Sequence, residues 1–389
     1  MSLIDTVTSR FEKNFGSAPE VVASAPGRVE FIGNHTDYNQ GPVMGAAIDK
    51  GVVVALKRCD EAVFKFSSST FPIAEVSDPS APQEGSASWV NYPLGIYNVL
   101  IKRGLEPKGG FCLSVESDVP SGAGLSSSAA LELATATALG EAYGIELSKK
   151  ELAMVGREAE NDFVGVPCGI LDQGVSAHGE EGKLVHIDCR NLEFSTAELG
   201  KDLSIWIFNT HQKHSLVDSM YATRNKECFA AVEQLNAAGL DAQYLADVSP
   251  EEFEAKRDAL EENARKRAEH VIYEIDRVKK VQAALEERDV EAVGRLLFES
   301  HDSSRDLFEN SVPELDYLVK ILRSMPGVLG ARLSGGGFGG AAMALAGETF
   351  TMDYAVAVAS AYRGEFGAEP EIIECRIADG ARLELPVSA

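Results

Sequence analysis

The sequence lacks any apolar run long enough to cross a bilayer. Its longest runs, such as residues 52–56, span only a few positions, whereas a membrane helix needs about 20. The opening residues are polar and charged and do not have the apolar core of a secretory signal. We therefore expect a cytoplasmic protein with no membrane partner.

Positive charge is scarce. The chain has 36 Lys and Arg against 60 Asp and Glu, which gives a formal net charge of -24. Such a field disfavours binding to nucleic acid or to an anionic membrane surface. A polyanionic ligand would have to be held by local features, namely backbone N–H groups, a helix N-terminus, a metal ion or a few well-placed cations.

The cysteines are few and scattered. The six of them show no paired short spacing, which disfavours both a disulfide framework and a cysteine-ligated metal cluster. Internal repeats and low-complexity tracts are also absent from the sequence. These absences leave an ordinary globular protein as the expectation.

The length of 389 residues predicts more than one domain. We place a boundary near residues 195–205, with an N-terminal domain of residues 1–200, a C-terminal domain of residues 201–389, and terminal strands that can exchange between them. Alternation and apolar runs predict strands at residues 29–32, 52–56, 112–115, 184–187, 328–333 and 341–345. Helical periodicity predicts helices at residues 127–143, 149–161, 216–238, 250–285 and 290–299.

A glycine- and serine-rich segment, residues 120–130, joins a predicted strand to an alanine-rich helix. Gly122 and Gly124 can adopt positive φ and turn successive N–H groups toward an anion. The serines at 126–128 then lie at the helix N-terminus, which favours phosphate, and a serine hydroxyl can also bind Mg²⁺. The segment lacks the Lys of a Walker loop and the spacing of a dinucleotide fingerprint. A serine-capped helix without a ligand would show the same pattern.

A second glycine cluster lies between two predicted strands. Five of the six residues 335–340 are glycine, beginning with Gly335, Gly336 and Gly337. Glycine loses much conformational entropy on folding, so such a cluster indicates that its backbone freedom is used. We expect an ordered loop that packs against a ligand or the first glycine-rich loop, rather than a flexible linker.

Hydrogen-bonding side chains follow the predicted strand at residues 29–32. Asn34, His35, Asp37 and Tyr38 lie within five positions. Amide, imidazole and carboxylate groups together can both donate to and accept from hydroxyl groups. The loop therefore predicts a site for a polyhydroxylated ligand such as a sugar, with a turn that binds no ligand as the alternative.

Asp172 follows apolar residues, so we expect it to be partly buried. A buried carboxylate requires a cation, and Arg28 is the natural candidate. The pair would keep Asp172 ionised as a weak base, which suffices in phosphoryl transfer because positioning and charge neutralisation supply most of the catalysis. Glu160, at the end of the preceding helix, would complete a Mg²⁺ shell with a serine hydroxyl, or else be a solvated helix-end carboxylate.

These segments, in this order, resemble the GHMP kinases, and within them the galactokinase family, over nearly the whole chain. Weaker matches lie at residues 89–92, at residues 214–216 with Tyr221 and Arg224, and at residues 300–301 with residues 305–306. The resemblance implies a two-domain α+β fold, with an N-terminal domain like domain 2 of ribosomal protein S5, a ferredoxin-like C-terminal domain and the active site in the cleft between them. It also implies ATP, Mg²⁺, transfer to the anomeric oxygen of a hexose, and a monomer or weak homo-oligomer.

The resemblance also implies roles for individual residues. Asp172 would accept or guide the sugar proton, while Arg28 would hold Asp172 and the developing phosphoryl charge. The residues implied to contact the sugar are Asn34, His35, Asp37, Gly169 and Tyr221, and those implied to bind phosphate are Gly122, Gly124, Leu125, Ser126, Ser127 and Ser128. Ser128 and Glu160 would bind magnesium, and Trp89 would line the adenine pocket. Gly335, Gly336 and Gly337 would form a structural loop.

Two positions depart from the galactokinase pattern. Asn34 stands where the family has a Glu that binds the sugar near its 6-hydroxyl, and Glu30 stands where the family has an Asn. A site without the negative charge at position 34 would admit a C6 carboxylate or a sugar altered at that end, so galacturonate and L-arabinose are alternatives to galactose. We expect the Glu30 side chain to point away along the strand. A sugar sensor without catalysis is a third alternative, which the intact Asp172 and residues 126–128 disfavour.

Overall fold

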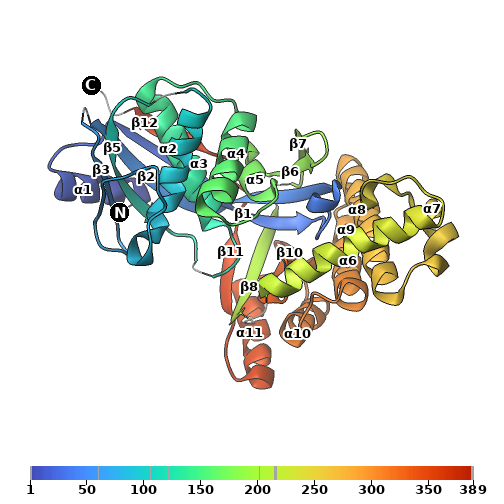
Figure 1. The fold of residues 1–389 in the computed structure, drawn as a ribbon. Coiled ribbons are helices and arrows are strands. Elements are labelled where there is room, and N and C mark those ends of the chain that lie inside the picture. The colour runs from blue at the N-terminus through green and yellow to red at the C-terminus, as the bar shows by residue number, and fades with distance from the viewer. Residues whose placement is uncertain are drawn as a thin grey trace.

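Two β-sheets with flanking helices make up the chain (Figure 1). The first sheet has eight strands and the second has four. The arrangement confirms the expected α+β class, and within the described part of the chain no helix is long and apolar enough to cross a membrane. The computed structural model describes residues 2–59, 61–105, 107–120, 122–200, 202–213 and 217–386.

The first sheet is built around two long antiparallel strands, β1 (Val21–Ile32) and β2 (Pro42–Cys59). The strand order is β12-β1-β2-β5-β3-β4. Strand β6 pairs with the first residues of β2, and β7 pairs with β6. Strand β12, from near the end of the chain, thus pairs with β1. This pairing agrees with the expectation that terminal strands can exchange between the two parts of the chain. The remaining strands are β3 (Phe64–Ser68), β4 (Ala74–Val76), β5 (Gly110–Ser117), β6 (Lys183–Asp188), β7 (Glu193–Glu198) and β12 (Arg382–Pro386).

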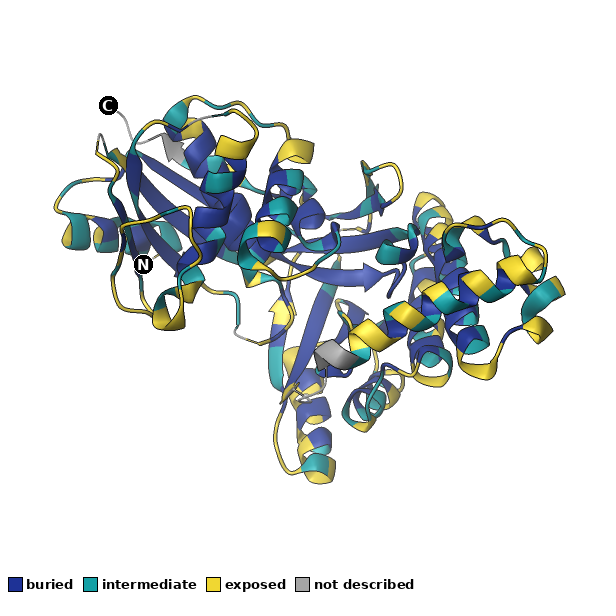
Figure 2. Ribbon diagram, viewed as in Figure 1, coloured by how far each residue is buried: buried dark blue, intermediate teal, exposed yellow. Residues whose placement is uncertain are grey.

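Helix α3 (Ser127–Tyr143) is buried on nearly all sides (Figure 2). Its many alanines allow close packing against the first sheet and against α2 (Asn91–Lys102), α4 (Lys149–Glu158) and α5 (Leu171–His178). Both ends of the predicted helix at 127–143 are confirmed. The helix stops at Tyr143 because Gly144 adopts a left-handed φ of 67°. On the opposite face of the sheet, α1 (Leu3–Phe15) packs its apolar side.

The second sheet contains β8 (Leu203–Lys213), β9 (Val328–Ser334), β10 (Gly339–Gly347) and β11 (Glu371–Cys375) in the order β11-β8-β10-β9, all antiparallel. Taken in chain order these strands are 4-1-3-2, the ferredoxin-like arrangement. One face packs against α10 (Pro313–Leu322) and α11 (Met352–Phe366). The other face shares a core with β1, α8 (Glu262–Glu286) and α9 (Val290–Ser303), so the two sheets pack on each other through apolar side chains.

A helical region extends from the second sheet and comprises α6 (Val217–Ala237), α7 (Pro250–Lys256) and α8. The single helix predicted at 250–285 is wrong. The chain leaves α7 through a short turn, and Leu260 adopts an extended backbone before α8 begins. Leu260 is buried at this break, in the same apolar cluster as Phe253 of α7 and Ala264 of α8. The predicted start of α6 at residue 216 lies outside the described residues.

Two other predicted helices end differently. The prediction at 149–161 is divided between α4 and a π-helical turn, Ala159–Val164, and α9 runs to Ser303 before a second π-helical turn, Ser304–Phe308. Such turns often occur at functional sites. The division of the chain at residue 200 remains a prediction.

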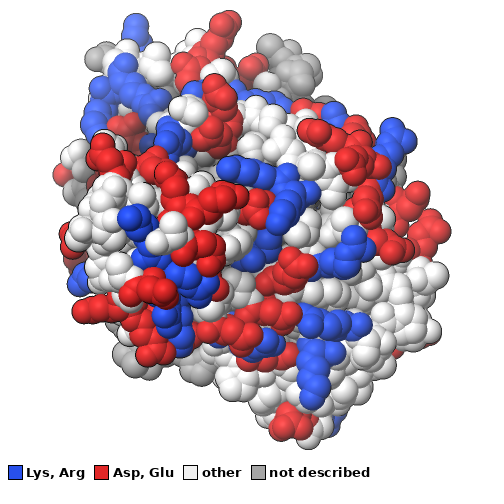
Figure 3. Space-filling model, turned by 90° about the vertical axis from the view of Figure 1, so that its right-hand side faces the viewer, with Lys and Arg blue, Asp and Glu red and all other residues white. Residues whose placement is uncertain are grey.

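Charged side chains of both signs are interspersed over the face shown in Figure 3. Exposed ion pairs such as Arg305 with Asp302 and Arg323 with Asp302 contribute at most about 1 kcal/mol each. The surface charge therefore bears on solubility more than on the stability of the fold.

The close approach of α9 to β9 provides a test of the fold. A Cβ at Gly294 would overlap the backbone carbonyl of Leu329. We expect Gly294→Ala to lower the free energy of unfolding by about 1–3 kcal/mol, because strand and helix must separate. Denaturant titration measures this change. Gly364 lies inside α11, where an added Cβ would have no other atom within 4 Å, so Gly364→Ala is the control and should be neutral or slightly stabilising; equal effects of the two variants would contradict the packing.

Candidate active site

A cavity of about 700 Å³ lies between the two halves of the chain. Its described walls come from Arg28, from the phosphate loop at residues 122–128 and from the glycine loop at residues 334–341. The two glycine-rich segments therefore face the same space, as expected. Among the described lining residues Arg28 alone carries a positive charge, so an anion in this acidic protein would depend on Arg28 and on backbone N–H groups.

The phosphate loop is held against β1. The Arg28 backbone N–H donates to the Leu125 carbonyl at 3.0 Å. A Cβ at Gly27 would lie 2.6 Å from that carbonyl oxygen, so only glycine permits this approach. Gly122 and Gly124 both take positive φ, 74° and 69°, in agreement with the predicted turn. No side chain caps the N-terminus of α3, which leaves its first N–H groups open to an anion.

Arg28 and Asp172 form a bidentate ion pair. Arg28 Nε lies 2.8 Å from Asp172 Oδ1 and Nη2 lies 2.7 Å from Oδ2. The remaining Nη1 donates to the Gly124 carbonyl at 2.6 Å. One guanidinium thus joins β1, the phosphate loop and the first turn of α5, and it holds the Asp172 carboxylate beside the cavity. The structure shows the expected pair, while its catalytic role remains a prediction.

The three serines of the phosphate loop differ in their contacts. The Ser126 hydroxyl donates to Asp172 Oδ2, so it supports the carboxylate and does not cap α3. Ser127 opens the helix and lines the cavity. Ser128 forms a hydrogen bond with Glu160. The phosphate-binding roles predicted for all three remain predictions.

Glu160 lies among other acidic groups in a buried position. Gln173 Nε2 donates to Glu160 at 2.6 Å and to the fully buried Glu132 at 3.0 Å. Burial, followed by the charge of Asp172, raises the pKa of Glu160, and burial next to Glu160 raises the pKa of Glu132 well above its usual value. The solvated alternative for Glu160 is therefore wrong. The neighbouring carboxylates repel one another, and a bound cation would relieve that repulsion. Carboxylate and hydroxyl oxygens are also the ligands that a hard cation such as Mg²⁺ prefers.

Asp37 lies against Gly169. A Cβ at position 169 would overlap the Asp37 carboxylate, so a larger residue there would displace the Asp37 side chain. Burial raises the pKa of Asp37 to about 6, and the nearby charges of Glu30 and Asp172 add to the increase. Two carboxylates thus act on Asp37, and the half-exposed ring of Tyr221 lies near the Asp37 charge.

His35 connects the sugar loop, residues 33–39, to the glycine loop. Its Nε2 donates to the Gly336 carbonyl at 3.0 Å, and its Nδ1 accepts from the Tyr38 hydroxyl at 3.1 Å. Burial lowers the pKa of His35 to about 4, so the ring is neutral at pH 7. The ring also packs on Phe308 and Tyr221, with centroids 4.4 and 5.0 Å away. To contact a sugar, His35 would have to exchange one of these partners.

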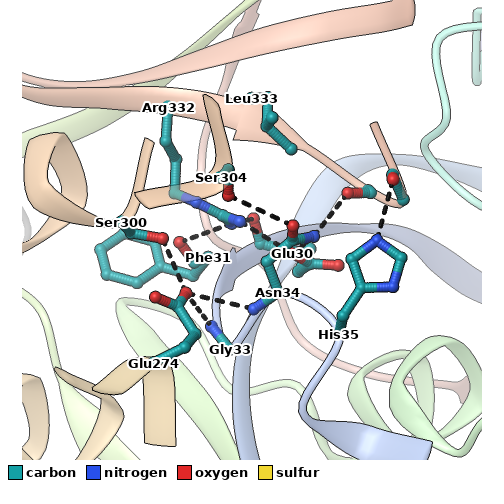
Figure 4. Close-up of polar contacts among 12 residues, drawn as sticks. Glu30, Phe31, Gly33, Asn34, His35, Glu274, Ser300, Ser304, Arg332 and Leu333 are labelled. Carbon is teal, nitrogen blue, oxygen red and sulfur yellow. Dashed lines mark hydrogen bonds and ion pairs between the residues drawn. The ribbon is translucent and has the colours of Figure 1, made fainter. Parts of the chain in front are cut away.

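Asn34 is fully buried, and its side-chain amide is committed to protein groups (Figure 4). The Nδ2 group donates to Glu30 Oε1 at 2.9 Å and to the Gly335 carbonyl at 2.8 Å. The Oδ1 atom accepts from Asn310 Nδ2 at 2.8 Å. The sequence predicts a sugar contact for Asn34, but in this arrangement its side chain has no unused hydrogen-bonding group for one.

The expectation that Glu30 points away from this region is wrong. Its carboxylate contacts Asn34 and also pairs with the buried Arg332 of β9 at 3.0 Å (Figure 4). Every residue of β1 is buried, so neither face of the strand offers water to a charged side chain. Glu30 must therefore find a cation inside the protein, and the second sheet supplies it.

Sequence reasoning missed Glu274 of α8. It accepts from the backbone N–H groups of Gly33 and Asn34, at 3.2 Å each, and from Ser300 Oγ at 2.6 Å (Figure 4). Burial alone would raise its pKa, but the Arg277 guanidinium 2.7 Å away and further cationic and hydroxyl neighbours lower it to about 2. Glu274 thus fixes the start of the sugar loop. Its place within the apolar stripe of α8 was the available signal, since a solvated Glu would lie outside that stripe.

Trp89 does not line the 700 Å³ cavity. Its half-buried ring stacks on Phe71, with centroids 6.0 Å apart, and contacts Phe66 edge-on. Within the described part of the chain its Nε1–H has no hydrogen-bond partner. Its role in an adenine pocket remains a prediction.

Comparison with known proteins assigns the class first. The chain matches the GHMP kinase N-terminal domain over residues 91–180 and the GHMP kinase C-terminal domain over residues 281–365. Mevalonate kinase from Methanococcus jannaschii superposes with a TM-score of 0.65, covering 94% of this chain and 100% of that one, at 19% identity. Such a distant likeness shows the fold alone, and that fold is the two-domain GHMP kinase fold.

More specific matches assign the family. Residues 9–58 match the galactokinase galactose-binding signature. The chain is 38% identical over 384 residues to galactokinase of Actinobacillus pleuropneumoniae serotype 3, covering 97% of this chain and 98% of the relative, and 40% identical over 365 residues to that of Canis lupus familiaris, covering 91% of each. Lactococcus lactis galactokinase, solved in complex with galactose, has a TM-score of 0.92 at 34% identity and covers 98% of this chain and 100% of that one.

The chain therefore belongs to the galactokinase family. It is a sugar kinase, a phosphotransferase that uses ATP and has an alcohol group as acceptor.

The pKa of Asp37 predicts how stability depends on pH. Because folding raises this pKa from 3.8 to about 6, the ionised carboxylate destabilises the fold above pH 6, and the penalty disappears as the pH falls below 4. In the absence of sugar, Asp37→Asn should therefore be more stable than wild type at pH 7.5 by about 3 kcal/mol.

This advantage should shrink between pH 6 and pH 4, where wild-type Asp37 takes up its proton. Chemical denaturation at several pH values measures it. Exposed Asp258 serves as the control, since Asp258→Asn should show no such trend. An advantage of Asp37→Asn that did not vary with pH would contradict the assignment.

Proposed function

We propose that this chain transfers the γ-phosphoryl group of ATP to the anomeric hydroxyl of D-galactose, giving ADP and galactose 1-phosphate. The observation that carries the proposal is the position of Asp172: Arg28 and Ser126 hold its carboxylate between the phosphate loop and the sugar loop. The structure of the Lactococcus lactis relative in complex with galactose supports the choice of sugar.

The nucleotide phosphates bind at the N-terminus of α3. The open N–H groups there and the left-handed Gly122 and Gly124 form a cradle for an anion. Leu125 and the hydroxyl of Ser127 complete the phosphate contacts, and Ser126 acts there through its bond to Asp172. The adenine would have to extend beyond this cavity to reach Trp89. The glycine loop, residues 335–337, closes the opposite side of the cavity.

Ser128 and Glu160 would hold Mg²⁺. Among the described residues no set of three or more His, Cys, Asp or Glu side chains is arranged to bind a metal, so the nucleotide phosphates would supply further ligands, as is usual for this ion. When bound, Mg²⁺ neutralises charge on the phosphates.

Asp172 accepts or guides the proton of the anomeric hydroxyl. The bidentate contact with Arg28 fixes the orientation of the carboxylate. Arg28 also contacts the phosphate loop through Gly124, so its charge lies close to the transferred phosphoryl group. Alignment of the two reactants supplies much of the rate.

The sugar occupies the space bordered by Asp37, Gly169 and Tyr221. The Asp37 carboxylate offers two acceptor oxygens, and Gly169 leaves room beside it. The carboxylate of Glu30 lies in the same region. Glu30 therefore replaces the negative charge that is missing at position 34, which weakens the case for galacturonate. An additional carboxylate on the sugar would be repelled.

The partners are then ATP and the sugar, without nucleic acid or membrane, and the protein acts in the cytoplasm as a monomer or weak homo-oligomer. The formal net charge of -24 supports the exclusion of polyanionic partners.

A coupled assay of ADP release over a panel of free sugars tests the substrate. We expect galactose to give the highest kcat/KM, with galacturonate and L-arabinose at least about tenfold lower, because each lacks a matching neutral hydroxymethyl group. Turnover of another sugar without turnover of galactose would overturn the choice of galactose.

Replacing Asp172 tests the mechanism. Asp172→Asn should lower kcat about 100- to 10,000-fold, because the proton of the hydroxyl loses its acceptor. The Kd for ATP, measured by calorimetry, should stay within about threefold of wild type, since phosphate binding relies on the loop backbone. Asp258→Asn is the matched control and should retain full activity; if Asp172→Asn also did, Asp172 would have no part in the reaction.

The metal site is tested with Glu160→Gln. The Mg²⁺ concentration for half-maximal rate should rise about tenfold or more, because a charged oxygen ligand becomes a neutral amide. Glu158→Gln is the control, since Glu158 lies two residues away and pairs with Lys102 and Arg103 on the surface. An equal Mg²⁺ requirement in both variants would remove Glu160 from the site.

A further inference from the structure

Glu30 has one carboxylate oxygen in use and one free. Oε1 accepts from Asn34 Nδ2 at 2.9 Å and from Arg332 Nη2 at 3.0 Å. No hydrogen bond from any described residue reaches Oε2, which is also not among the buried polar atoms that lack a partner. Oε2 is therefore accessible to a small molecule and retains its capacity to accept.

The free oxygen lies on the side of β1 that faces the reaction. Arg28 and Glu30 are two residues apart in a regular stretch of the strand, where they pair with Ala47 and Gly45 of β2. Alternate residues project from the same face and are about 7 Å apart along it. Because Arg28 holds Asp172 at the reacting end, Glu30 stands one step further along, a separation suited to the length of a hexose.

Glu30 lies close enough to groups at the proposed sugar site for its charge to act on them. Its charge acts on Asp37, which lies against Gly169. Burial and the charges of Asp37 and then Glu30 raise the pKa of Tyr221. Glu30 is thus close to two of the side chains that border the proposed sugar site.

We propose that Glu30 Oε2 accepts a hydrogen bond from a sugar hydroxyl remote from the anomeric carbon, and that Asn34 supports Glu30 without itself contacting the sugar. The inference rests on the proposed function and adds a residue that determines which sugar is accepted. Relative to the galactokinase signature, Glu and Asn have exchanged positions 30 and 34, and the structure keeps them in direct contact.

The surroundings hold the Glu30 carboxylate in one orientation. Arg332 is fully buried, and its guanidinium also donates to the backbone carbonyls of Glu30 and Phe31 at 3.3 and 3.2 Å. Asn34 is fixed in turn by Asn310, Gly335 and the backbone contact to Glu274. An acceptor fixed in this way rejects a sugar that lacks the matching hydroxyl, because a buried carboxylate oxygen would be left without a partner.

Exchanging the two residues tests the inference. Glu30→Asn and Asn34→Glu are made singly and together. We expect Glu30→Asn to raise the galactose KM about tenfold or more with the ATP KM unchanged, because one charge-assisted hydrogen bond is lost. Asn34→Glu should also raise the galactose KM, since it places two carboxylates in contact. The double variant restores one Glu and one Asn in the pair, so its galactose KM should return to within about threefold of wild type.

Deoxygalactoses identify the hydroxyl. Wild type should discriminate strongly against one of the 3-, 4- and 6-deoxy analogues, and Glu30→Asn should lose most of that discrimination while keeping its preference at the other two positions. A uniform loss for all the analogues would mean that Glu30 only shapes the site, and would overturn the proposed contact.

Glu116→Asn is the matched control. Glu116 is 6% exposed and pairs with Arg10, much as Glu30 is 7% exposed and pairs with Arg332. It lies on β5, away from the cavity-lining residues. We expect this variant to lose stability but to keep the galactose KM. A KM for Glu30→Asn no higher than that of Glu116→Asn would overturn the inference.

The outcome for galactose itself separates the two proposals. If wild type turns over a different hexose, the proposed substrate fails, and the same variants are tested with that hexose, whose KM should respond to Glu30→Asn in the same way. If galactose is the substrate and the double variant is no better than Glu30→Asn alone, the exchange of roles fails while the proposed function stands.

Discussion

The bidentate contact between Arg28 and Asp172 organises the proposed reacting end of the site. It brings together β1, the phosphate loop and α5, three segments that are far apart in the sequence. Arg28 is buried and Asp172 is partly buried, so removing Asp172 would leave the guanidinium charge without its compensating partner. The contact therefore holds together the residues of the proposed reaction, and it also contacts Ser126 and Gly124.

The proposed sugar end depends on contacts from the second half of the chain. Glu274 holds the backbone at Gly33 and Asn34, while Arg332 neutralises Glu30. The sugar loop belongs to the first half by sequence, but its shape is set by α8 and β9. Relative movement of the two halves would consequently change the sugar site and the phosphate cavity at the same time.

The sequence predicted local elements of structure better than it predicted contacts between distant side chains. Helix α3 was predicted to its last residue because Gly144 ends it, and the two glycine loops were placed at one ligand site because their composition serves close approach. The break at Leu260 and the direction of Glu30 were not predicted. Both depend on burial against segments distant in the sequence, which local periodicity does not contain. The same limit hid Glu274, whose partners lie in a loop some 240 residues away.

The pairing of β12 with β1 has a consequence for how the protein is made. During synthesis β1 emerges early, yet one of its hydrogen-bonding edges finds its partner only when residues 382–386 leave the ribosome. Until then that edge is an unpaired strand, open to wrong partners from other nascent chains. The helices of the first half can pack early, but its sheet is completed last. Chaperone protection late in translation would therefore matter more for this protein than the order of its domains along the chain suggests.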